Sequence, residues 1–176
     1  MTLDIIKLSI ATPSEPILPG RGFYQVEEDA LHVQVGPFSH NRRFFSWIES
    51  PNVRLDFDRQ GRLIFIELAT ARRHWQTDPA LTPPDICEPA DIRWLDFRES
   101  VTEPVTVANP ERNLVCISFK ENGTPLNYHL ADSLVCQVDR NYNLTSIWIN
   151  DIVTDRAGKR IRAFRKKSRH NKSYYA

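Results

Sequence analysis

Two similar stretches of alternating apolar and polar residues constrain the fold of this chain more than any other feature. They are Val53–Leu68 and Leu134–Ile149, and they align when Asp139 is placed on Asp58. An apolar side chain at every second position is the pattern of a strand with one buried face, and each stretch has two such runs around a turn. Each stretch therefore predicts a β-hairpin, and the pair predicts an internal repeat. The aligned hydrophobic pairs are Phe57 with Val138, Leu63 with Leu144, Ile66 with Ile147 and Leu68 with Ile149.

The first hairpin turns over residues 58–62, which read D-R-Q-G-R. The Asp side chain can accept hydrogen bonds from backbone N–H groups ahead of it, and the Gly can take the positive φ that closes a type I turn with a bulge. The second stretch keeps Asp139 at this corner but has Tyr142 in place of the Gly. We therefore expect Asn141 or Asn143 to take the left-handed conformation there, and the two turns to differ in detail.

Further strands are expected wherever the same alternation recurs. In chain order these segments are Met1–Ala11, Phe23–Glu27, Leu31–Val35, Phe44–Ile48, Ile92–Phe97, Val105–Val107, Val115–Phe119 and Leu126–Leu130. Pro104 predicts that the strand after it lies at a sheet edge, because proline cannot donate to a ladder. Asn122-Gly123 is a strong signal for a two-residue hairpin turn between its flanking strands. Ala69–Trp75 fits either the end of a strand or one helical turn.

These segments divide the chain into five parts of one compact domain. The parts are an N-terminal strand and loop (1–22), a first repeat unit (23–72), a Pro-rich connector (73–112), a second repeat unit (113–152) and a basic tail (153–176). Each unit is expected to be a four-stranded antiparallel meander with one uncovered apolar face. Packing those faces together about a pseudo-twofold axis would bury both. The sequence therefore predicts an all-β fold of tandem pseudo-symmetric units, packed as a sandwich or a partly open barrel.

The cysteines and the N-terminal segment indicate a cellular compartment. Cys87, Cys116 and Cys136 are odd in number and lack C-x-x-C spacing, which predicts reduced and mostly buried thiols. The N-terminal apolar stretch contains Asp4 and Lys7 and has no basic leader, and no apolar run is long enough to cross a bilayer. We therefore expect a cytoplasmic protein without a membrane partner.

The net charge of +1 hides a strongly basic tail. Residues 156–176 hold nine Lys or Arg and no acid, while the remaining residues hold 14 basic and 22 acidic side chains. With Phe164, Tyr174 and Tyr175 between the charges, this composition suits phosphate contacts and base stacking. The tail could equally bind the acidic body of the same molecule or of a second copy, or act as a solubilising segment. The candidate residues for nucleic-acid or anion binding are Arg160, Arg162, Arg165, Lys166, Lys167 and Arg169.

Residues 23–72 also carry a family resemblance. The pattern is Tyr24-x4-Asp29-Ala30-Leu31, then D-x-D-x-x-G over residues 56–61, then I-E-L over residues 66–68. It resembles a small bacterial family catalogued as a domain of unknown function, and this resemblance implies a short β-meander and no assigned activity. The second unit at 113–152 departs from the pattern at each of these elements, so its membership depends on periodicity.

Three carboxylates are candidates for chemistry. Asp56, Asp58 and Glu67 lie on or beside the paired strands of the first hairpin, where they could bind a divalent cation or share a proton. Gln137 and Trp148 replace two of them in the second stretch, so a hairpin of this type does not require them. The ordinary alternative is that they are solvated or cap a turn. No nucleophile and no histidine or cysteine ligand is predicted with them, and no cofactor is expected.

Three functions remain open from the sequence. The favoured one is a non-catalytic binding or assembly module that associates with a protein partner or with itself. Contact would use an uncovered strand edge or the apolar residues Phe44, Phe45 and Trp47 near the Phe38–Arg43 loop. The second is nucleic-acid binding through the tail. The third is a hydrolase or metal-binding protein using the three carboxylates, and the absence of a G-x-S-x-G elbow, a Gly-rich phosphate loop and paired His ligands disfavours it.

Overall fold

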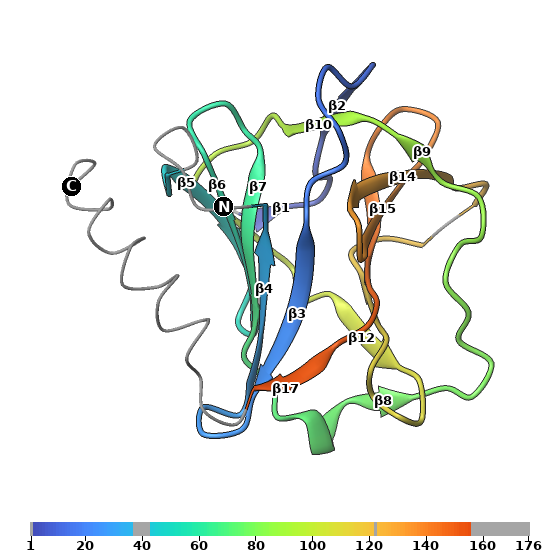
Figure 1. Cartoon of the computed structure of the whole chain (residues 1–176). Coiled ribbons are helices and arrows are strands. Elements are labelled where there is room, and N and C mark those ends of the chain that lie inside the picture. Colours follow the sequence, from blue (N-terminus) through green and yellow to red (C-terminus); the bar gives the residue numbers. More distant parts are fainter. Residues whose placement is uncertain (1, 37–42, 122, 156–176) are drawn as a thin grey trace.

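Two large β-sheets that face each other make up most of the molecule (Figure 1). The computed structural model of the chain describes residues 2–36, 43–121 and 123–155, and within them it contains seventeen strands and one short 3₁₀ helix. A two-stranded ladder lies between the sheets at one end. The all-β prediction is confirmed, and over these residues neither sheet closes into a barrel.

Sheet 1 has eight strands and an antiparallel centre. In spatial order its strands are β1 (Thr2–Leu3), β11 (Glu99–Val101), β5 (Ser46–Glu49), β6 (Val53–Phe57), β7 (Leu63–Leu68), β4 (Ala30–Val35), β3 (Gly20–Gln25) and β17 (Val153–Asp155). The added outer strands β1, β11 and β17 all pair in parallel. The sheet is therefore mixed, with short parallel strands around a five-stranded antiparallel core.

Sheet 2 has seven strands and the same type of centre. In spatial order its strands are β8 (Gln76–Thr77), β12 (Val105–Ala108), β13 (Val115–Ser118), β16 (Leu144–Ile149), β15 (Leu134–Val138), β14 (Leu126–Ala131) and β9 (Glu88–Pro89). The two outermost strands again pair in parallel. The remaining elements are the ladder of β2 (Leu8–Ala11) with β10 (Asp91–Trp94), and the helix η1 (Arg72–His74).

The centres of the two sheets have the same strand order. Sheet 1 reads β3-β4-β7-β6-β5 and sheet 2 reads β12-β13-β16-β15-β14, so each strand of one has a counterpart at the same place in the other. We call residues 20–68 the first unit and residues 105–149 the second unit. In both, the second strand pairs with the fifth, so the order is more complex than the predicted four-stranded meander, and β12 joins the second unit instead of the connector.

This order also makes the predicted hairpin turn at Asn122-Gly123 wrong. One side of β13 pairs with β12 and the other with β16, so neither side is left for β14. β14 pairs with β15 and β9 instead. β13 and β14 are therefore not neighbours, and the local turn preference does not pair the flanking strands; Asn122 itself lies outside the described residues. Pro104 precedes β12, the first half of which lies at the sheet edge as predicted. β8 pairs with the second half of β12 at Val107 and Ala108.

The two central hairpins are confirmed, and their turns are alike. Asp58 N–H donates to Arg62 O over 2.9 Å and Asp139 N–H donates to Asn143 O over 3.0 Å. Both hairpins contain a register shift just before the turn. Gly61 has φ +80° as expected, but Tyr142 takes φ +60° at the equivalent position. The expectation that an Asn would take this conformation is therefore wrong, because the turn's backbone hydrogen bonds fix the position whatever the residue.

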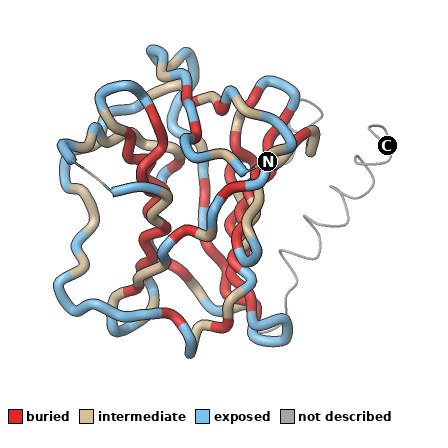
Figure 2. The backbone as a smooth tube through the Cα atoms, turned by 180° about the vertical axis from the view of Figure 1, so that it is seen from behind, coloured by how far each residue is buried: buried red, intermediate tan, exposed pale blue. Residues whose placement is uncertain are grey.

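One core fills the space between the sheets. It contains inward-facing residues of sheet 1 such as Leu55 and Ile66 and of sheet 2 such as Ile117 and Ile147, all of them fully buried. Figure 2 shows the buried positions running along the strands, with exposed backbone in the loops and in the connector. At Gly20 the sheets approach so closely that an added Cβ would lie 2.6 Å from Ala131 Cβ.

The segments before and after each unit bind the other unit. β8 follows the first unit in the chain but pairs with β12 of sheet 2, and β17 follows the second unit but pairs with β3 of sheet 1. The two ladder strands each bind the hairpin turn of one unit, since Trp94 N–H of β10 donates to Gly61 O and Leu8 N–H of β2 donates to Tyr142 O. In Figure 1 β8 and β17 lie at the end opposite to the β2–β10 ladder. The sheet of each unit is therefore extended by a strand that follows the other unit in the chain.

Candidate functional site

The three candidate carboxylates have separate partners. Asp58 is fully buried and its Oδ1 accepts hydrogen bonds from the N–H groups of Gln60 and Arg62, both at 2.9 Å. Its Oδ2 lies 3.2 Å from Arg62 Nε. Asp58 is therefore a turn-capping residue, which is the ordinary alternative given by the sequence.

Asp56 and Glu67 lie on the outer face of sheet 1, away from the core. Asp56 is 4% exposed and its Oδ1 accepts a hydrogen bond from Arg54 Nε at 3.2 Å. Glu67 Oε2 lies 3.2 Å from Nε2 of His32, whose side chain is fully buried. The two carboxylates sit diagonally, because Asp56 faces Phe65 and Glu67 faces Arg54 across the ladder. Among the described residues no three His, Cys, Asp or Glu side chains are placed to hold a metal ion.

The predicted tail site lies outside the described residues. This applies to Arg160, Arg162, Arg165, Lys166, Lys167 and Arg169 and to most of the Phe38–Arg43 loop. The apolar residues beside that loop are described. Phe44, Phe45 and Trp47 are all half-buried, and Phe45 N–H donates to Phe57 O over 2.8 Å, which extends the pairing of β5 with β6.

Arginine and aromatic side chains gather around Phe45 and Trp47 on the outer side of β5. We call this cluster the arginine–aromatic surface, and it consists of Phe45, Trp47, Arg54, Arg59, Phe97 and Arg98. The guanidinium carbon of Arg54 lies 5.1 Å from the Trp47 ring centre, and that of Arg59 lies 5.0 Å from the Phe45 ring centre. Phe97 meets Phe45 edge to face at 6.4 Å and is 43% exposed.

Arg98 connects the two rings of this surface. Its guanidinium carbon lies 5.8 Å from the Phe45 ring centre and 5.6 Å from the Trp47 ring centre. Its backbone has φ +53°, a conformation that costs roughly 1 to 3 kcal/mol for a residue with a side chain. The neighbouring Glu99 begins β11, which pairs in parallel with β5 at Ile48. A strained backbone next to a paired strand thus holds this guanidinium against both rings.

The sequence predicted two of the six residues of this surface. It singled out Phe45 and Trp47, but it placed Phe97 at the end of an expected strand and gave Arg98 no role. The missing information is the parallel pairing of β11 with β5, which brings residues 97–101 beside residues 46–49. No local signal marks that pairing, because parallel neighbours far apart in the chain leave no turn between them.

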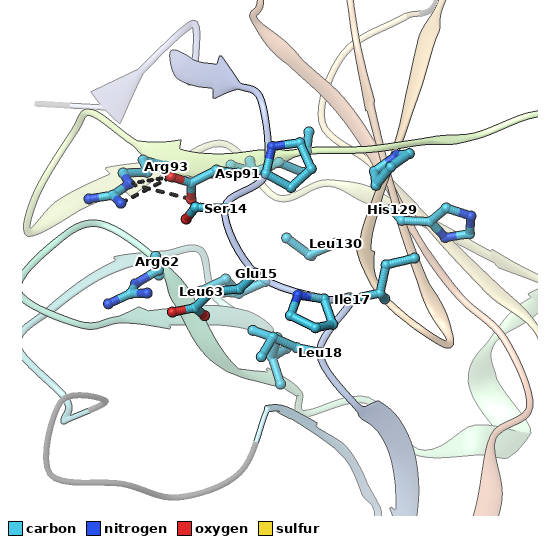
Figure 3. Close-up of a pocket in the computed structure, with 16 residues that line it drawn as sticks. Ser14, Glu15, Ile17, Leu18, Arg62, Leu63, Asp91, Arg93, His129 and Leu130 are labelled. Atoms are coloured by element: carbon cyan, nitrogen blue, oxygen red, sulfur yellow. Dashed lines mark hydrogen bonds and ion pairs between the residues drawn. The ribbon is translucent and has the colours of Figure 1, made fainter.

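A small pocket lies between the two units, beside the β2–β10 ladder (Figure 3). Figure 3 shows Arg62, Glu15, Arg93 and Asp91 gathered at one side and His129 at the other. The charges are largely matched, since Arg93 Nη2 lies 3.0 Å from Asp91 Oδ2. The volume of about 80 Å³ is far below the roughly 300–1,000 Å³ of sites for organic ligands. A space of this size fits a few water molecules or a small ion, and it does not define a function.

A second hollow of about 170 Å³ occurs at the equivalent place in the other half. Its lining includes Ile6, Val101, Phe119 and Leu144, where the first pocket has Ala90, Ile17, Val35 and Leu63. The polar residues that line the second hollow are Asp4, Thr102 and Lys120, and they differ from the polar residues that line the first pocket. The hollows therefore follow from the shared arrangement of the two units, and their charges are particular to each.

No family model matches the chain, and a search of curated proteins gave no match. The resemblance of residues 23–72 to a domain of unknown function thus stays a prediction. No helix in the described part of the chain is long and apolar enough to cross a membrane.

Proposed function

We propose that this protein is a non-catalytic binding module whose arginine–aromatic surface takes a protein partner. The observation that supports the proposal is the surface itself, with the guanidinium groups of three arginines held against the rings of Phe45 and Trp47 and with Phe97 packed edge to face on Phe45. Trp and Arg are the residues most enriched at the energetic centres of protein interfaces. A guanidinium stacked on a ring can still donate its N–H groups to carboxylates while the ring offers apolar contact. Arg54 already donates to Asp56 and Glu49 of this chain, so the proposal assigns the contact with a partner's carboxylate to Arg98. The partner would therefore present acidic and flat apolar groups together.

The strand edges support this choice of surface over β-strand addition. The outermost strands of both sheets in the described chain are two or three residues long, namely β1, β17, β8 and β9. A partner strand gains little from so few backbone groups, and short edges of this kind protect sheets against edge-to-edge association. The sequence predicted association either through a strand edge or through apolar side chains beside the Phe38–Arg43 loop. The short edge strands favour the second mode, which uses Phe45 and Trp47.

Site-specific photocrosslinking in living cells would test the proposal. A photoreactive phenylalanine analogue replaces Phe97 at the surface, and in a second strain it replaces Ile86, which is 83% exposed on the connector. We expect a discrete adduct from position 97 that is lost on Arg98→Ala and weakened about tenfold or more on Trp47→Ala. Equal adducts from positions 97 and 86, or none from 97, would refute the proposal.

Single-stranded nucleic acid is the second candidate, because bases also stack on aromatic rings flanked by arginine. The basic tail, with its predicted phosphate contacts, would add to the same activity. This candidate requires that affinity for a labelled oligonucleotide falls steeply as the salt concentration rises. Binding that does not change with salt, or no binding at all, would leave the protein partner as the proposal. A hydrolase or metal-binding function has no such support, since Asp56, Asp58 and Glu67 are each engaged separately.

The proposed location is the cytoplasm, and the cysteines support it. Cys87, Cys116 and Cys136 are all free thiols. Burial raises the pKa of the Cys116 and Cys136 thiols, which keeps them in the unreactive protonated form. Free thiols in the core are ordinary in a reducing compartment and uncommon in secreted proteins.

A further inference from the structure

The outer face of sheet 1 is built like an interior although it points away from the core. Its central row crosses the sheet as Glu67, His32, Phe23 and Val153, on β7, β4, β3 and β17. His32 is fully buried and Phe23 is 8% exposed. Phe65 from the neighbouring row is 4% exposed. A solvated sheet face would not bury these side chains.

Acidic groups surround the aromatic centre of this face. Glu28 Oε2 lies 3.5 Å and Glu67 Oε2 lies 3.2 Å from His32 Nε2, and the two side chains are 46% and 35% exposed. At the rim Gln25 donates to Asp155 Oδ2 over 3.2 Å. Phe44 and Val153 pack against the pair Phe23 and Phe65. We call this region the acidic–aromatic face, and it consists of Phe23, Glu28, His32, Phe65, Glu67 and Asp155.

The equivalent face of sheet 2 shows how such a surface is covered. Its row contains Cys116, Trp148 and Val135, and Leu81 and Cys87 of the connector pack against them. Figure 1 shows the connector running along the outside of sheet 2 from β8 to β9. The segment that follows β8 in the chain is therefore the cover of sheet 2.

β17 occupies in sheet 1 the place that β8 occupies in sheet 2. Each pairs in parallel with the first strand of the opposite unit, β17 at Phe23–Gln25 and β8 at Val107–Ala108. The chain that continues from β17 at Asp155 is residues 156–176. We propose that this basic segment covers the acidic–aromatic face of its own molecule, as the connector covers sheet 2.

The charge and the length of the segment fit this face. Its nine Lys or Arg residues carry no balancing acid, and the face offers the carboxylates of Glu28, Glu67 and Asp155. Ile161 and Phe164 are three positions apart and would supply apolar contact to Phe23 and Phe65. The four strands β7, β4, β3 and β17 span about 14 Å at the usual spacing, and twenty-one residues cover about 30 Å even when fully helical. The segment therefore reaches across the sheet in either conformation.

This cover does not depend on the proposed partner and uses a different part of the sheet. The acidic–aromatic face lies over β7, β4 and β3, whereas the arginine–aromatic surface lies over β5 and β6. A positively charged segment is attracted to the first region and repelled by the arginines of the second. The outer side of sheet 1 is thus divided between an internal cover and an external contact.

Zero-length carbodiimide cross-linking of the full-length protein tests the proposal. We expect the lysines of the tail, Lys159, Lys166, Lys167 and Lys172, to form amides with Glu28 and Glu67 in the monomer. Asp85 and Glu88 on the sheet 2 side are exposed control acids and should give several-fold fewer products. The yield at Glu28 and Glu67 should fall several-fold in about 1 M NaCl, where the Debye length is about 3 Å.

A variant and an isotope experiment give the outcomes that would overturn the proposal. In Arg165→Glu/Lys166→Glu/Lys167→Glu, the remaining Lys159 and Lys172 should lose most of their products with Glu28 and Glu67. An unchanged yield in this variant, or equal yields at Glu28, Glu67, Asp85 and Glu88, would refute a specific cover. Mixing ¹⁴N and ¹⁵N protein identifies the donor of each lysine, and a majority of heavy–light products would show that the tail covers a second copy instead.

Discussion

The outer faces of the two sheets differ far more than their inner faces. Positions that correspond in strand order carry His32 and Glu67 in sheet 1 but Cys116 and Trp148 in sheet 2. In sheet 2 the Trp148 Nε1–H donates to Gln137 Oε1 over 2.7 Å, so the face is neutral and internally bonded. The inner faces of both sheets are aliphatic and share one core. The fold thus depends on what the units have in common, and function is to be sought where they differ, on the outside of sheet 1.

The largest difference in stability between the two units is expected at their hairpin turns. Gly61→Ala places a Cβ 2.5 Å from Trp94 O at a φ of +80°, so we expect a loss of about 3 kcal/mol or more in the free energy of unfolding. Tyr142→Gly relieves a side chain at φ +60° and should change that free energy by less than about 1 kcal/mol. Urea unfolding of both variants measures the difference. Equal losses would mean that the two turns are not held in the same way.

A smaller effect is expected at the aspartates that cap these turns. Asp58 is fully buried with two backbone donors and Arg62 Nε, so Asp58→Ala should cost about 2 to 4 kcal/mol. Asp139 accepts from the N–H groups of Asn141 and Asn143 on the surface, and Asp139→Ala should cost about 1 kcal/mol. Thermal unfolding of the two variants side by side would rank them, and a larger loss at Asp139 would contradict the burial argument.

The outer faces themselves give the third comparison. Trp148→Phe removes the indole donor and leaves Gln137 Oε1 without that partner in a buried place, so we expect a loss of about 1 to 2 kcal/mol. Glu67→Gln at the corresponding position keeps an acceptor for His32 and is partly exposed, so it should cost less than about 1 kcal/mol. Chemical denaturation measures both. A greater cost at Glu67 would show that the charged face matters more to stability than the neutral one.

The smallest effect is a dependence on pH at the second turn. The Lys120 ammonium, with backbone and side-chain donors of Asn143, lowers the pKa of the Asp139 carboxyl. A lowered pKa in the folded state adds stability above the ordinary value of about 3.9, and that stability is lost as the pH falls below it. Asp139→Asn should therefore flatten the acid side of the stability profile, measured by unfolding between about pH 2 and pH 5. A profile unchanged by the substitution would exclude this source of acid sensitivity.

The sequence predicted the local elements of this fold well and the long-range ones poorly. Alternation at Val53–Leu68 and Leu134–Ile149 identified both hairpins, because period two and a turn residue are properties of neighbouring positions. The pairing of β4 with β7 and of β13 with β16 could not be predicted, since it depends on which edges remain free after collapse. Asn122-Gly123 shows the limit, because its strong local preference gave way to the core that β13 and β16 bury together.

The candidate site was predicted to the same extent. Phe45 and Trp47 were identified as apolar residues beside a loop, while Arg98 became part of the surface through the parallel strand β11. Tyr142 shows the reverse case, in which residue preference pointed to a neighbouring Asn. Its side chain is 41% exposed and meets no steric barrier from the core, so the turn could retain its shape without glycine.

The crossed positions of β8 and β17 have a consequence for how the gene can change. A recombination event that removed either unit would expose the apolar inner face of the remaining sheet to water and would remove one of its flanking strands. Neither half can therefore be shuffled into another protein as a self-sufficient module. We therefore expect the two units to fold only together, so that new binding properties would arise by substitutions on the surface and not by exchange of one unit.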